Sequence, residues 1–138
     1  MRKNLRCYNP AKQTAPFQFF IQNKGYNSGK PHLKPLTNCF TASFNSDDEC
    51  EEYYWLVYAL WQSGLFRPFL YGSVVEYIRI TDLAELIEIH AGLLQRKRER
   101  FMAALEQVVQ IELKKTQIEN NLTNLLKLRR ERLREILS

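Results

Sequence analysis

The sequence predicts an α+β fold: a small, mainly antiparallel sheet packed by an aromatic-rich helix and followed by a long basic C-terminal helix or helical hairpin. Three observations support this class. Two short aromatic runs flank a loop rich in glycine and proline, an apolar helical segment follows a capping signal, and residues 93–137 contain neither proline nor glycine. Strand-like runs followed by helical runs are typical of α+β domains.

The composition is sufficient for one ordinary domain with its own core. Of the 138 residues, 45% are hydrophobic and 12% are aromatic, which argues against global disorder. No apolar run is long enough to cross a membrane, and the N-terminus lacks the apolar segment of a signal peptide, so we expect no membrane association. The three cysteines stand outside any CxxC pattern, which favours reduced thiols in a cytoplasmic protein.

Charge is distributed unevenly along the chain. Residues 1–34 carry seven basic side chains and no acidic one, residues 35–92 carry two basic against nine acidic, and residues 93–138 carry eleven against six. Two interpretations stay open. Either the oppositely charged segments fold onto one another, or the basic ends attract nucleic acid.

The first third of the chain predicts an arm and a hairpin. Residues 1–16 are polar and interrupted by two prolines, which predicts a flexible basic arm. Residues 17–23 and 38–44 have the aromatic content and alternation of strands, and the glycines and prolines of residues 24–35 are typical of a turn. On the second strand, one face would hold Phe40, Ala42 and Phe44 and the other Cys39, Thr41 and Ser43.

A helix is predicted over residues 47–62. Ser46 and Glu49 have the spacing of a capping box, and Gly64 supplies a stop signal. The middle of this helix is apolar or aromatic at every position. We therefore expect more than one of its faces to be covered.

The next segment predicts a third strand and a second helix. Pro68 restricts residues 65–72 to an edge strand or a short extended piece, whereas residues 74–80 alternate as a strand does. A helix then begins at Thr81 or Asp82, with an apolar stripe of Leu83, Leu86, Ile87, His90 and Leu94. Gly92 either ends this helix or lies within a longer one. We place the boundary between an α+β domain, residues 1–92, and a helical extension, residues 93–138, at this glycine.

The helical extension has an incomplete heptad pattern. Its apolar positions fall in two series, Leu94, Phe101, Leu105 and Val108, and then Ile111, Ile118, Leu122, Leu125 and Ile136. Lys115, Arg129 and Arg132 interrupt the second series. A self-associating coiled coil, a hairpin that bends near residues 116–123, and packing on the domain's own sheet all stay open.

The loop between the first two strands is a candidate ligand site. Its glycines and lysine resemble a phosphate-binding loop, but only three residues separate the glycines and Pro31 follows Lys30, so the P-loop pattern is not met. The candidate contacts are Tyr26, Asn27, Ser28, Lys30 and His32. The sequence indicates no catalytic, cofactor-binding or metal-ligating residue, because neither histidine has a second ligand nearby and acidic neighbours of Cys50 oppose a thiolate.

The basic clusters of the extension are candidate nucleic-acid contacts. They are Arg96, Lys97, Arg98, Arg129, Arg130 and Arg132. Interspersed glutamates at i, i+4 spacing also fit an ordinary solvated helix face. Both interpretations are retained.

Two stretches resemble a known group of proteins. Gly25-Tyr26-Asn27-Ser28-Gly29-Lys30-Pro31 leading to Asn38-Cys39-Phe40, and Gly72-Ser73-Val74-Val75-Glu76-Tyr77-Ile78-Arg79-Ile80, are similar to a family of small uncharacterised bacterial proteins associated with mobile genetic elements. The resemblance spans residues 17–90 and implies a bacterial cytoplasmic setting without catalytic residues.

The function that we expect is non-enzymatic. The chain would act as a binding or adaptor protein through its long helix and the loop 24–35, with a protein partner or a second copy as ligand and without a cofactor. A nucleic-acid-binding accessory protein of a mobile element is the alternative. An enzyme of unknown type is the third hypothesis.

Overall fold

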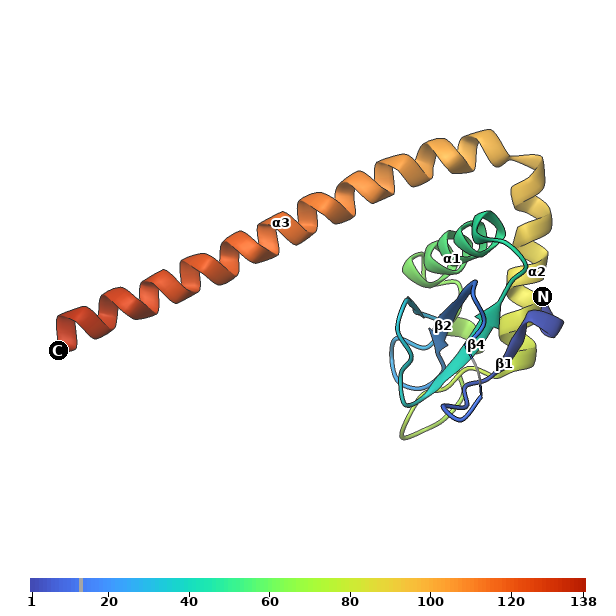
Figure 1. The fold of residues 1–138 in the computed structure, drawn as a ribbon, viewed down its shortest axis with the longest axis horizontal. Helices are drawn as coiled ribbons and strands as arrows, with labels where there is room; N and C mark the ends of the chain where they lie inside the picture. The colour runs from blue at the N-terminus through green and yellow to red at the C-terminus, as the bar shows by residue number, and fades with distance from the viewer. Residues whose placement is uncertain (13) are drawn as a thin grey trace. The chain divides into compact units, whose positions relative to one another are not determined.

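The chain folds into two structural units. The computed structural model describes residues 1–12 and 14–138, and its units are Met1–Arg96 and Lys97–Ser138. Figure 1 shows the strands and helices that form them. Because α-helices and an antiparallel sheet lie in separate stretches of the chain, the α+β class is confirmed.

An antiparallel sheet is the centre of the first unit. Its strands are β1 (Leu5–Cys7), β2 (Gln18–Gln22), β3 (Pro31–His32) and β4 (Cys39–Ser43), in the order β1-β4-β2-β3. β2 and β4 pair along their whole length, from Gln18 opposite Ser43 to Gln22 opposite Cys39. The two strands predicted over residues 17–23 and 38–44 and their antiparallel pairing are therefore confirmed. They do not form a simple hairpin, because β3 lies in the connection between them and pairs with the other edge of β2.

Two helices cover one face of the sheet. α1 (Asp47–Gln62) contacts β2 and β3, while α2 (Ile80–Arg96) contacts β1, and the two helices contact each other (Figure 1). On the covered face, Leu5, Ala42 and Phe19 lie side by side across three strands. They meet apolar side chains of the helices, which are Leu56, Val57, Leu60, Leu83, Ala84 and Ile87.

The ends of α1 follow the local signals of the sequence. Ser46 Oγ accepts a hydrogen bond from the Glu49 backbone N–H at 3.2 Å, and the Glu49 carboxylate accepts one from the Asn45 N–H at 3.4 Å. After Gln62 the chain leaves the helix through Gly64, whose φ of 78° favours glycine. The predicted bounds of this helix are confirmed.

The prediction of a flexible arm over residues 1–16 is wrong for its first half. A short 3₁₀ helix, η1 (Arg2–Asn4), leads into β1, which pairs with β4 along the sheet edge. Tyr8 follows β1 and meets Phe20 edge to face, with the ring centroids 5.6 Å apart. The second face of the sheet is therefore not open to solvent, and Thr41, which we expected on a half-buried strand, is buried.

The predicted strand over residues 74–80 is also wrong. Val74 is 95% exposed, and the segment makes only isolated bridges, from Tyr77 to Lys24 and to Tyr71. β3 and β4 already pair with both edges of β2. Residues 74–80 therefore bridge to Lys24, which lies beyond the end of β2, and not to β2 itself. Upstream, the piece expected to be extended contains a 3₁₀ helix, η2 (Arg67–Phe69), with Pro68 in its first turn.

The helical extension contains one long helix that does not fold back, which excludes the hairpin among the three alternatives left open by the sequence. α2 runs through Gly92 to Arg96, Lys97 leaves the helical conformation, and α3 (Arg98–Leu137) extends for 40 residues. Inside the predicted bend, the Thr116 and Thr123 hydroxyls each donate to the carbonyl four residues earlier at 3.0 Å. At 1.5 Å per residue, α3 is about 60 Å long, and none of its residues is buried.

Candidate interaction surfaces

The loop after β2 is held by the segment that precedes α2. The Gly25 backbone N–H donates to the Glu76 carbonyl at 2.7 Å, and the Ile78 N–H donates to the Asn23 carbonyl at 3.1 Å. The two stretches that carry the sequence resemblance are thus neighbours in space. We call residues 24–30 and 65–79 together the loop platform.

Gly29 anchors the loop platform on the core. Its φ is 98°, and a Cβ atom at this position would overlap the ring of Phe66. Phe66 is itself one of the largest fully buried side chains. Ser28, next to it, is buried, and its hydroxyl donates to the Gly25 carbonyl at 2.6 Å. This part of the loop is therefore structural.

The outer surface of the loop platform carries arginines stacked on tyrosines. The Arg67 guanidinium lies 3.4 Å from the ring centroid of Tyr26, and that of Arg79 lies 4.1 Å from Tyr71. Arg79 Nε also donates a hydrogen bond to the Asp82 carboxylate at 2.9 Å, and this bond raises the pKa of Arg79. The loop platform also carries exposed apolar side chains, namely Leu65, Phe69, Val74, Val75 and Tyr77.

The five candidate ligand contacts of the loop do not converge on one point. Tyr26 and Asn27 are exposed, whereas Ser28 is buried. Lys30 stands over the ring of Trp61 on α1, with Nζ 5.1 Å from the centroid. His32 lies on β3, 3.3 Å from the Gln22 side chain, and its pKa is lowered by burial and then by the charge of Lys30. Of these side chains, Tyr26 belongs to the exposed surface of the loop platform.

A second concave surface lies along the first half of α1. Its cavity volume is about 350 Å³, and we call it the α1 groove. The α1 residues that line it are Asp47, Cys50, Glu51, Tyr54 and Trp55; the other wall consists of residues 16–18 and Leu33. The pKa of Tyr54 is raised by burial, and that of Cys50 is raised by burial and then by Asp47 and Glu49. These shifts disfavour a reactive thiolate in the groove.

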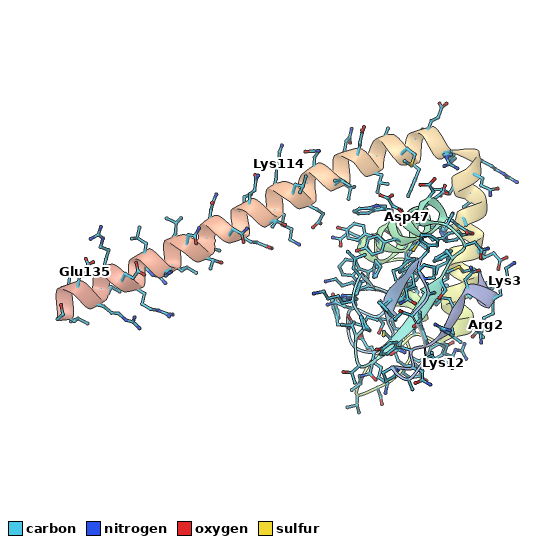
Figure 2. The ribbon with its side chains drawn as sticks, viewed as in Figure 1. Arg2, Lys3, Lys12, Asp47, Lys114 and Glu135 are labelled. Atoms are coloured by element: carbon cyan, nitrogen blue, oxygen red, sulfur yellow. The ribbon has the colours of Figure 1, made fainter. Side chains whose placement is uncertain are left out.

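The third surface is the apolar stripe of α3, whose members recur at spacings of three, four, seven and eight residues. Its members are exposed at 55–78% and are Ile111, Ile118, Leu122, Leu125, Leu133 and Ile136. Lys115 and Arg129 lie on the same side of the helix. Figure 2 shows the side chains of α3, among them Lys114 and Glu135, projecting from the helix along its length.

The predicted nucleic-acid contacts fall into separate clusters. Arg96 ends α2 and Arg98 begins α3, while Arg129, Arg130 and Arg132 lie in the last third of α3. Along the axis of α3, Arg98 and Arg129 are separated by about 45 Å. Arg132 forms an ion pair with Glu135 at 2.9 Å, with both side chains well exposed.

Neither the α1 groove nor the arginine–tyrosine pairs were expected from the sequence. The acidic and aromatic residues of the groove recur at helical spacing, which is a signal that the sequence contains. The pairing of Arg67 with Tyr26 joins residues that are far apart in sequence, and no local pattern indicates it. His90 Nδ1 lies 2.8 Å from the Leu86 carbonyl oxygen of its own helix.

Among residues 1–12 and 14–138, no group of three or more His, Cys, Asp or Glu side chains is placed to hold a metal ion. None of the helices described is both long and apolar enough to cross a membrane.

Comparison with known proteins gives one match. Residues 5–135 match the family described as "Family of unknown function (DUF6943)". No curated protein and no solved structure matches the chain. The match reaches beyond residues 17–90 and takes in β1 and nearly all of α3, so the long helix is part of what defines the family.

Proposed function

The chain belongs to DUF6943, a family of unknown function, and from this premise we propose that it is a non-enzymatic binding protein whose α3 pairs with α3 of a second copy. The observation that supports the proposal best is the exposed apolar stripe of α3. A soluble helix normally buries such a stripe against another element.

The energetics of the stripe favour pairing. Full burial of one leucine or isoleucine side chain contributes about 1.5–3 kcal/mol. Leu122, Leu125 and Leu133 are each more than half exposed in the chain as described. Isolated helices gain little from propensity alone, and most helical stability in proteins comes from packing of an apolar face. Pairing would therefore stabilise α3 as well as hold the two copies together.

Charge favours an antiparallel pair. Residues 127–135 carry five basic and two acidic side chains, whereas residues 98–112 carry two basic and three acidic ones. A parallel pair would place the basic segments of both copies together and bring Arg129 of one copy opposite Arg129 of the other. An antiparallel pair places each basic segment beside the acidic part of the other helix, including Glu106.

The loop platform supplies a second surface for an adaptor. Tyrosine and arginine are the side chains most often found at the centre of protein interfaces. Tyr26 is 68% exposed, and Arg67 is already held against its ring. A surface that is ordered in advance loses less conformational entropy on binding. We assign the loop platform to contact with a second protein.

The mass of the protein in solution tests the pairing. The mass measured by light scattering over a range of micromolar concentrations should approach twice the 16.4 kDa of one chain. The mass should change little with salt, because apolar burial is not screened. A mass of one chain at all concentrations would reject the proposal.

The alternative, a nucleic-acid-binding accessory protein of a bacterial mobile element, has one specific observation in its favour. Five exposed basic side chains lie within residues 127–134. The bacterial, cytoplasmic and mobile-element setting itself depends on the sequence resemblance alone.

This alternative predicts a salt-dependent complex with short DNA or RNA. Replacing Arg129, Arg130 and Arg132 by glutamine should reduce the slope of log affinity against log salt by about three, because each phosphate contact contributes about one. Replacing Lys12, Lys24 and Lys34 removes the same charge from the first unit and is the control. Equal effects in both variants, or no complex with the natural chain, would exclude the basic cluster as a nucleic-acid site.

A further inference from the structure

The α1 groove combines aromatic walls with carboxylates on one face of a helix. Asp47, Cys50, Glu51, Tyr54 and Trp55 follow the i, i+3, i+4, i+7, i+8 spacing that brings residues to the same side of α1. Phe17, at the start of β2, and Leu33 face them across the groove. Figure 2 labels Asp47, at the first turn of the helix.

We propose that the α1 groove binds the side chain of a lysine or arginine presented by a partner protein. The groove differs from the stripe of α3 and from the loop platform in its location and in its chemistry. This inference therefore stands independently of the pairing of α3.

The aromatic walls suit a cation with an apolar stem. The rings of Tyr54 and Trp55 are nearly perpendicular, at 89°, with centroids 5.4 Å apart. At this distance the two rings are in edge-to-face contact with each other, and both residues line the groove. A cation that enters the groove to within about 6 Å of a ring face is attracted to that ring. The methylene groups of lysine or arginine would meanwhile replace water on the apolar lining.

The same helix already holds a cation in this way. Lys30 Nζ lies 5.1 Å from the ring centroid of Trp61, which follows Trp55 by six residues on α1. The rings of Trp55, Tyr58 and Trp61 follow one another at centroid distances of 5.4 and 5.9 Å. The aromatic row on α1 thus has a cation at one end, and the α1 groove offers an equivalent environment at the other.

The carboxylates of the groove are available for a cation. The side chains of Ser46 and Glu49 cap α1. Within the described part of the chain, the carboxylates of Asp47 and Glu51 have neither a hydrogen bond nor an ion pair. No described residue that lines the groove is basic. The groove therefore has negative charge without an internal counter-ion, and a basic side chain would supply it.

The dimensions of the groove fit a single side chain. Ligand pockets in proteins span about 300–1,000 Å³, and the α1 groove, at about 350 Å³, is at the small end of this range. A partner residue would enter through the open side and place its charged end between the aromatic rings and the two carboxylates.

Titration of the full chain with blocked amino acids tests the assignment. The probes are the N-acetyl amides of lysine, arginine and norleucine, and the readout is the indole N–H signal of Trp55 in a nitrogen–proton correlation spectrum. The lysine or arginine probe should shift this signal saturably, and norleucine, which has the apolar stem without the charge, should bind at least about fivefold more weakly. Equal binding of all three probes, or no shift with either cation, would overturn the proposal.

Two charge variants distinguish a carboxylate inside the groove from the general negative charge at the start of α1. Glu51→Gln should weaken binding of the lysine or arginine probe about three- to fivefold, as expected for an exposed ion pair. Asp48→Asn removes the same charge from the first turn of α1 but lies outside the groove, so its effect should stay within about twofold. Equal loss in the two variants, or binding of tetramethylammonium in preference to the blocked amino acids, would contradict a basic side-chain site.

Discussion

Gly29→Ala is expected to lower the free energy of unfolding of the first unit by about 3 kcal/mol, with a range of about 2–5. Two causes add. A φ of 98° is unfavourable for alanine, and the new Cβ would overlap the ring of Phe66, which is 2% exposed and cannot move outward without opening the core. Tryptophan fluorescence in urea measures the effect on this unit alone, because Trp55 and Trp61 are the only tryptophans in the chain.

Gly64→Ala is the matched control for this prediction. Gly64 has a similar positive φ of 78°, but a Cβ atom there meets nothing within 4 Å. This variant should lose only about 1 kcal/mol, the cost of the backbone conformation. Equal losses at the two positions would mean that Gly29 does not press against Phe66 and that the loop platform is less firmly anchored than described.

Replacing Ile118, Leu122 and Leu125 by glutamate is expected to abolish self-association. Each substitution removes a large apolar side chain from the stripe and would place a charge in the interface. A loss of about 4 kcal/mol or more corresponds to at least a thousandfold weaker dimer. Light scattering at micromolar concentration should then give the mass of one chain, and the helix signal in circular dichroism should fall as α3 loses its partner.

The control places the same charges on the other side of α3. Gln117, Asn120 and Asn124 are exposed and lie opposite the stripe at helical spacing. Their replacement by glutamate should leave the dimer intact. Dissociation of both variants would show that added charge, and not loss of the apolar stripe, controls the mass of the protein.

The elements that were predicted correctly depend on short-range signals. α1 begins after Ser46 and ends before Gly64, and both residues act within one turn of the helix end. β2 and β4 contain short aromatic runs that identify them as strands, although residues on both of their faces are buried. These features are encoded within a few residues, so the sequence alone reveals them.

The errors share a different cause. β1 has three residues, of which only Leu5 is buried, and it is a strand because β4 offers an edge. Residues 74–80 alternate like a strand, yet both edges of β2, the strand nearest to them in the fold, are already paired with β3 and β4. The chain then turns into α2 at Ile80. Tertiary pairing decides both cases, and a single sequence does not display it.

The candidate surfaces could be predicted only in part. The exposed stripe of α3 was visible as a heptad series, although its straight course through Thr116 was not. The α1 groove is lined both by Phe17, just before β2, and by Trp55 of α1, which are distant parts of the sequence. In the loop platform, Tyr26 contacts Arg67, which is distant in sequence, so this surface can be identified only from the folded chain.

Pulsed electron–electron distance measurement between two copies tests the antiparallel pairing of α3 most directly. Spin labels would be attached in separate Asn120→Cys and Arg134→Cys variants, with the exposed Cys7 replaced by serine and the buried Cys39 and Cys50 left unchanged. An antiparallel pair with full overlap predicts less than about 30 Å between labels at position 120 and about 50 Å between labels at position 134, from the helix rise and diameter. Short distances at both positions would contradict the antiparallel arrangement, and the absence of any intermolecular distance would contradict pairing itself.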